Sequence, residues 1–253
     1  EQRSIDRLMI DLDGTPNKSR LGANAILSVS MAVARAAAAG RGMPLFMHLA
    51  DIYPRPDHPI SLPIPMLNVI NGGKHAKNNL DVQEFMIVPH GFGSFGEALR
   101  AAVEVYASLR SLLVSKGLSV GVGDEGGFAP DLPNNEAGME LLCEAIGRAG
   151  YAPGREVSLA LDVAASSLLR AGDSRYRFEG KDLESAQLSQ AYSSWVDRYP
   201  LVSLEDPLGE EDWPGWSALT LLLGERVQIV GDDILVTNPE RIRRGVHAGT
   251  ANS

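Results

Sequence analysis

The sequence has little cysteine, few aromatic residues and no long apolar run, and each shortage excludes a class of protein. The single cysteine, Cys143, cannot form an internal disulfide, and it excludes a zinc site built from several thiolates. This cysteine usage suits a reducing compartment, so we expect a cytoplasmic protein. Aromatic residues make up 6% of the 253 residues, but 44% are hydrophobic and 22% charged, which is ordinary globular composition rather than a disordered or fibrous bias.

Basic residues are also in short supply. The chain has 23 lysines and arginines against 32 aspartates and glutamates, a formal net charge of −9. This charge would repel a nucleic-acid backbone or an anionic membrane surface, so we expect neither partner. The longest membrane-like segment, 25–39, is rich in alanine and contains Arg35 and two serines. We expect it to be too short and too polar to span a bilayer, and residues 1–20 lack the apolar stretch of a signal peptide.

The first part of the chain predicts a helical unit followed by a connector. Residues 18–39 follow a helical apolar pattern and are rich in alanine, the strongest helix former. The stretch 53–65 then contains prolines at positions 54, 56, 59, 63 and 65. Because proline blocks a continuing helix, we place a domain boundary near residue 56, which gives domains 1–55 and 56–253.

Beyond the connector the pattern predicts an α/β fold. Apolar runs of strand length at 64–70 and 82–88 precede helical stretches at 95–116 and 135–149, so the order opens strand, strand, helix, helix. Strands at 157–161, 201–204 and 227–230 then alternate with helices at 184–198, 214–223 and 239–246. This alternation indicates βα units and a parallel sheet whose strands are buried on both faces. Three parallel strands do not close a barrel, so the architecture looks unfinished.

Each of the three later strands ends in an acid: Asp162, Glu205 and Asp232. In α/β folds the carboxyl ends of the strands form the active-site rim, so these acids should converge. Carboxylates about 5 Å apart repel by roughly 3 kcal/mol per pair at a dielectric near 20. A dication would relieve this repulsion, and all-oxygen ligands favour magnesium over zinc. The alternative is that each acid only caps a helix or meets an arginine.

Two loops offer further polar side chains. The segment GVGDEGGFAP, residues 121–130, places four glycines around two acids, so Glu125 is presented either into a site or to solvent on a surface turn. His75 in NGGKHA could meet an anionic substrate or relay a proton, although a lone loop histidine is more often a surface residue. Glu84 next to an apolar run could equally be an edge charge, and Gln83 beside it is uninformative by itself.

Seven segments taken together resemble the enolase (phosphopyruvate hydratase) family, in order and over essentially the whole chain. They read DLDGTPNKSRLGANAILSVS, PMLNVINGGKHA, DVQEFMIVP, GVGDEGGFAP, SLALDVAAS, VSLEDPL and QIVGDDILVTNP. The resemblance implies the reversible dehydration of 2-phosphoglycerate to phosphoenolpyruvate in glycolysis, with two Mg²⁺ ions. It also implies a small N-terminal α+β domain, here a helical remnant, before an incomplete TIM-like barrel that opens strand, strand, helix, helix.

The resemblance also implies roles for individual residues. The expected ligands of the tighter Mg²⁺ are Asp162, Glu205 and Asp232. The expected catalytic residues are Glu125, the acid that protonates the departing hydroxyl, and Glu84 in the same network. The expected substrate contacts are His75 near the phosphoryl group, Gln83, Glu84, Glu205 and Asp232. As general acid Glu125 needs a raised pKa, and we expect the like charge of Glu84 to raise it.

The resemblance leaves the catalytic base without a counterpart. In enolases the base is a lysine that ends the strand after the ANS stretch, and here that stretch is residues 251–253. The five lysines, at 18, 74, 77, 116 and 181, end no barrel-like strand. We therefore expect the isolated chain to lack turnover, whereas its full-length parent would be a homodimeric, Mg²⁺-dependent enolase. The alternatives are a non-catalytic binding or structural protein derived from an enolase half-barrel, and another enzyme of the superfamily.

Overall fold

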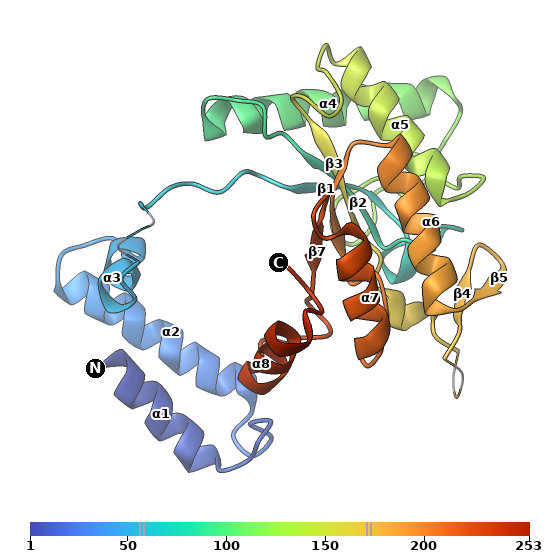
Figure 1. Cartoon of the computed structure of the whole chain (residues 1–253). Helices are drawn as coiled ribbons and strands as arrows, with labels where there is room; N and C mark the ends of the chain where they lie inside the picture. Colours follow the sequence, from blue (N-terminus) through green and yellow to red (C-terminus); the bar gives the residue numbers. More distant parts are fainter. Residues whose placement is uncertain (56, 58, 171, 173) are drawn as a thin grey trace. The chain divides into compact units, whose positions relative to one another are not determined.

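The computed structural model describes residues 1–55, 57, 59–170, 172 and 174–253, in two compact units, residues 1–62 and 63–253 (Figure 1). The units divide inside the proline-rich connector. The boundary expected at residue 56 lies outside the described residues, and the domain assignment 1–55 and 56–253 remains a prediction.

The first unit consists of three helices, α1 (Gln2–Asp13), α2 (Ala23–Gly40) and α3 (Leu45–Ile52). The helix expected at 18–39 begins five residues later than predicted, because a loop precedes it. The buried carboxylate of Asp13 accepts hydrogen bonds from the backbone N–H groups of Arg20 and Leu21, at 3.1 and 2.6 Å. These bonds hold the residues before α2 out of helical geometry.

Helix α2 has 18 residues and is apolar enough to cross a membrane by length and composition alone, which differs from the expectation for segment 25–39. Only 11% of it is buried. Ala34 and Ala38 are buried where α2 packs against its neighbours α1 and α3. The exclusion of a membrane partner therefore remains a prediction.

The second unit contains a five-stranded sheet in the order β1-β2-β3-β6-β7. Its strands are β1 (Leu67–Asn71), β2 (Glu84–Val88), β3 (Ser158–Asp162), β6 (Leu201–Glu205) and β7 (Gln228–Val230). Strand β2 is antiparallel to β1 and β3, whereas β3, β6 and β7 are parallel. Within the described residues the sheet does not close, so the expected incomplete barrel is confirmed.

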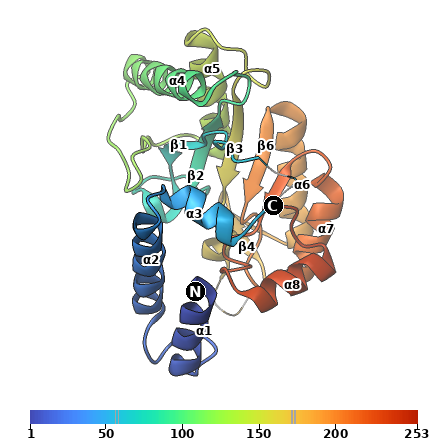
Figure 2. The same ribbon diagram turned by 90° about the vertical axis from the view of Figure 1, so that its left-hand side faces the viewer.

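Helices flank this sheet, above it and along its right-hand side in the view of Figure 2. They are α4 (Phe95–Ser115), α5 (Asn135–Arg148), α6 (Ser185–Arg198), α7 (Trp213–Leu223) and α8 (Pro239–Ala248), with short 3-10 turns η1 (Gly73–His75) and η2 (Ala165–Leu168). Strands β4 (Tyr176–Phe178) and β5 (Lys181–Leu183) form a separate hairpin. The five helices lie within one or two residues of the predicted ranges. Polar residues fix their starts: Asn238, for example, caps α8 by accepting from the N–H groups of Glu240 and Arg241.

The strand register places the acidic residues in one row. Glu84 pairs with Asp162, and Asp162 pairs with Glu205, which in turn pairs with Val230 just before Asp232. Strands β3, β6 and β7 all end at this edge of the sheet. Strand β2 runs the other way, so its first residue, Glu84, lies at the same edge.

Candidate active site

Five carboxylates gather at the ends of β3, β6 and β7. Ligand oxygens of Asp162, Glu205 and Asp206 lie within 4.8 Å of one another, and those of Asp206, Asp232 and Asp233 form a second such group. The predicted trio of Asp162, Glu205 and Asp232 is thus not one tight group in the structure. Asp206, which sequence reasoning did not single out, belongs to both groups.

Burial and mutual repulsion make the ionised form of several of these carboxyl groups unfavourable. Burial, with repulsion from Asp162, Asp232 and Asp233, raises the pKa of Glu205 to about 7. Burial is also the main cause that raises the pKa of Asp206 to about 7 and that of Asp162 to about 6. Within the described part of the chain, none of these acids forms an ion pair with a lysine or arginine. A bound cation would supply the missing positive charge.

Gln83 and the chain after β3 fix the carboxylate of Asp162. The side-chain amide of Gln83 donates to Asp162 Oδ2 at 3.2 Å, and its backbone N–H donates to the carbonyl oxygen of Asp162 at 3.0 Å. The N–H of Ala164 donates to the other oxygen, Oδ1, at 3.0 Å. Gln83 therefore lies beside the acidic row, where it orients one of the predicted metal ligands.

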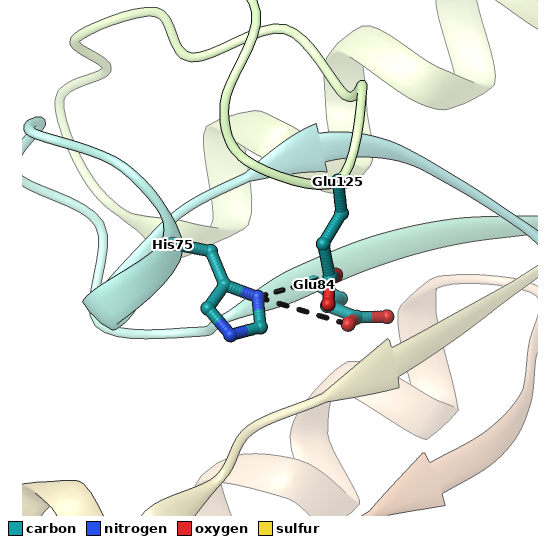
Figure 3. Close-up of side chains that lie close together, drawn as sticks. All are labelled: His75, Glu84 and Glu125. Carbon is teal, nitrogen blue, oxygen red and sulfur yellow. Dashed lines mark ion pairs between the residues drawn. The ribbon is translucent and has the colours of Figure 1, made fainter.

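A second cluster joins the row at Glu84 (Figure 3). His75, from η1, places its Nδ1 3.1 Å from Glu125 Oε2 and 3.9 Å from Glu84 Oε1. The closer contact is an ion-pair contact rather than an aligned hydrogen bond. Asn68, on β1, donates to Glu125 Oε2 at 3.0 Å. Four elements, β1, η1, β2 and the loop before α5, thus bring a histidine, an asparagine and two carboxyl groups together.

The two glutamates of this cluster differ in protonation, and the expectation for Glu125 was wrong. Burial, then a hydrogen bond to Glu125 and repulsion by Asp162, raises the pKa of Glu84 to about 8. The pKa of Glu125 is lowered, first by the hydrogen bond with Glu84 and then by the hydrogen bond from Asn68 and the nearby imidazole of His75. The physical reason is exposure: the Glu125 side chain is 41% exposed and that of Glu84 only 17%. The pair therefore keeps its proton on Glu84.

Glycine is required in the loop that carries Glu125. A Cβ on Gly127 would lie 2.3 Å from Asn71 Oδ1, and one on Gly123 would lie 2.7 Å from the carbonyl oxygen of His75. The hydroxyl of Tyr106, on α4, donates to the carbonyl oxygen of Gly126 at 2.7 Å. The loop therefore packs directly on β1 and η1, which fixes Glu125 beside His75.

The structure brings every predicted site residue to one edge of the sheet. Sequence reasoning missed Asp206 and Asn68. Asp206 follows Glu205 directly, so the pair of acids before Pro207 was an available signal, but spacing does not tell which of two consecutive acids faces a ligand. Nothing in the sequence marked Asn68. The roles assigned to the predicted residues remain predictions.

Comparison with known proteins identifies the family. A family model of the enolase C-terminal TIM barrel domain matches residues 59–253, and one of the enolase N-terminal domain matches residues 1–49. An enolase from Acidothermus cellulolyticus is 55% identical over 253 residues, which cover 100% of this chain and 57% of that relative. The chain thus spans little more than half the length of this relative. It belongs to the enolase family.

Proposed function

We propose that the full-length protein containing this chain is a Mg²⁺-dependent enolase that interconverts 2-phosphoglycerate and phosphoenolpyruvate. One observation carries this proposal. At a single edge of the sheet, strand-terminal acids that have no lysine or arginine partner among the described residues lie next to a glutamate pair that holds one proton. The 55% identity to an enolase supports the same reaction.

The acidic row fits a hard divalent cation. Its donors are carboxylate oxygens, which suit Mg²⁺ better than a thiophilic metal. Asp162, Glu205 and Asp232 would hold the ion, which would stabilise the negative charge that builds up when a proton is removed next to a carboxylate. The raised pKa values of Asp162 and Glu205 support this assignment, because both carboxylates gain free energy from a nearby positive charge.

The glutamate pair would handle the proton that leaves with the hydroxyl group. Glu84 is the buried member and keeps the proton at neutral pH, whereas Glu125 is exposed enough to touch a ligand. In the dehydration direction, the proton of Glu84 would pass through their shared hydrogen bond to Glu125, and Glu125 would pass it on to the departing hydroxyl, which leaves as water. Glu125 thereby keeps its proposed role as acid, with Glu84 as the store of the proton.

The remaining predicted contacts complete the site. His75 lies beside Glu125 and is the imidazole available to an anionic substrate, and Gln83 orients Asp162. We propose that the lysine that removes the proton is outside these 253 residues, so that this chain alone does not turn over substrate. A cytoplasmic location and a homodimeric full-length parent belong to the same proposal.

A direct assay tests the function. The full-length protein should form phosphoenolpyruvate from 2-phosphoglycerate, followed by ultraviolet absorbance, only when Mg²⁺ is present. The 253-residue chain, assayed at equal concentration, should show no activity. A full-length protein that is folded and binds Mg²⁺ without turnover would contradict the proposal and favour a non-catalytic role, and turnover by the short chain would contradict the placement of the base.

A further inference from the structure

Asp206 connects the three chain segments that carry the acidic row. Its backbone N–H donates to the carbonyl oxygen of Val230, the last residue of β7, at 3.0 Å. Its backbone carbonyl accepts from the N–H of Ala165, in the turn after β3, at 2.9 Å. Asp206 itself follows the last residue of β6. One residue therefore fastens together the ends of all three parallel strands.

The side chain of Asp206 makes the third connection, to the loop after β7. Its Oδ1 accepts from the backbone N–H groups of Asp232 and Asp233, both at 3.2 Å, and its Oδ2 accepts from Asp233 N–H at 2.9 Å. Only 4% of the residue is exposed, whereas Asp232 is exposed. The carboxylate is thus turned toward backbone donors that set the position of Asp232.

The backbone of Asp206 has a conformation that few residues adopt. Its φ is +40°, in the left-handed region, which aspartate tolerates better than most residues with a Cβ. This turn directs the chain after Glu205 back toward β7. Both the conformation and the carboxylate are then used for the same contact with the loop that carries Asp232.

We propose that Asp206 is a positioning residue, whose carboxylate holds the loop after β7 so that Asp232 stands beside Glu205 before any ion binds. The proposal depends on the proposed function only in taking the ion to be Mg²⁺. Groups that orient metal ligands typically change metal affinity about 10-fold to 100-fold when they are replaced.

Two substitutions in the full-length protein separate the carboxylate from the backbone turn. Asp206→Gly removes the carboxylate, and glycine adopts a φ of +40° without strain. Asp206→Asn keeps one acceptor oxygen but places an amide donor against the N–H of Asp233. The matched control is Glu210→Gln, because Glu210 lies on the same connection, its side chain is exposed, and the change removes the same charge.

The first measurement is hydrogen exchange on the metal-free protein. Amide exchange at residues 232 and 233 should become at least tenfold faster in the Asp206→Gly variant, at least threefold faster at residue 233 in the Asp206→Asn variant, and unchanged in the control. Unchanged exchange at these amides in either folded Asp206 variant would overturn the proposal. If the glycine variant fails to fold, the asparagine variant decides.

The second measurement is Mg²⁺ affinity by titration calorimetry. The dissociation constant should rise at least tenfold in the Asp206→Gly variant, and kcat should return to within about threefold of wild type at saturating Mg²⁺, which a damaged fold would not allow. An unchanged dissociation constant would overturn the proposal. A wild-type protein that binds no Mg²⁺ would instead contradict the proposed function, and the exchange result would still decide whether Asp206 holds the loop.

Discussion

Glu84 opens strand β2 directly opposite Asp162, the last residue of β3. This pairing exists because β2 runs antiparallel to β3. In a parallel arrangement the same glutamate would lie at the other end of the strand, about 13 Å away. The reversed second strand is therefore the feature that joins the glutamate pair to the acidic row. It also explains why the pKa of Glu84 responds to Asp162 and Glu205.

This proximity predicts that the metal-free protein loses stability as the pH rises. The native pKa of Glu84 is about 8 and its ordinary value is 4.5, so between these values the unfolded state binds fewer protons than the native state. The free energy of unfolding then falls with pH, by up to about 1.4 kcal/mol per pH unit for each such group. Glu205, Asp206 and Asp162 act in the same direction up to about pH 6 to 7.

Urea unfolding of the full-length protein with a chelator present, between pH 5 and 8, measures this slope. The Glu84→Gln variant should have a shallower slope than wild type. Glu225→Gln, at an exposed glutamate, is the control and should keep the wild-type slope. Equal slopes for wild type and Glu84→Gln would show that Glu84 does not keep its proton in the native state.

Replacing one acid of the row should have opposite effects on the metal-free and the metal-bound protein. Glu205→Gln removes repulsion with Asp162 and Asp232, so the metal-free protein should become more stable by about 1–3 kcal/mol. The same variant should lose most of the stabilisation that Mg²⁺ gives to the wild type. Thermal unfolding with chelator and with Mg²⁺ measures both effects.

The control for this change is Asp197→Asn, because Asp197 is an exposed surface acid that pairs with Arg226. It should leave the response to Mg²⁺ unchanged. If Glu205→Gln destabilised the metal-free protein, the carboxylate would be satisfied by contacts within the chain and would not need a cation.

The glutamate pair predicts a specific pH profile in the full-length enzyme. Glu125→Gln should lower kcat about 10²-fold to 10⁴-fold, the usual contribution of a general acid. In the wild type, kcat/KM should fall toward alkaline pH, because Glu84 then loses the stored proton. Bound Mg²⁺ reduces the repulsion from Asp162 and Glu205, so the decrease should lie at or below the metal-free pKa of about 8. In the Glu84→Gln variant the remaining activity should lack this alkaline decrease. Steady-state rates from pH 6 to 9 test it, and a decrease that persists in Glu84→Gln would assign the titration to another group.

Much of the second unit could be predicted from sequence because its elements carry strong local signals. Helices α4 and α5 have regular apolar periods and begin after Ser94 and Asn134, whose side chains accept from first-turn N–H groups. The β4–β5 hairpin was missed because its strands have only three residues each. The turn between them has positive φ at Glu179 and Gly180. Hairpin turns of this kind are usually recognised from an Asn-Gly pair, and here glutamate stands at the first position.

The sequence predicts which residues form the site, but it does not predict which of them are protonated. Strand-terminal acids such as Asp162 and Glu205 follow from buried runs, because parallel strands share an edge. Which of Glu84 and Glu125 holds the proton depends on exposure and on partners such as Asn68, and these appear only after the loop has folded onto β1.

The packing of that loop gives a last prediction, on Gly127. An alanine Cβ there would meet Asn71 Oδ1 at 2.3 Å and the backbone nitrogen of Ile70 at 3.0 Å, so the loop must move away from β1. Gly127→Ala should cost about 1–3 kcal/mol of stability and lower kcat, because Glu125 shifts with the loop. Gly147→Ala is the matched control: Gly147 lies in α5 with nothing within 4 Å of the added Cβ, so stability should rise by about 0.4–1 kcal/mol with no change in kcat. Equal stability and kcat in the two variants would show that the loop tolerates a side chain and that its contact with Asn71 does not position Glu125.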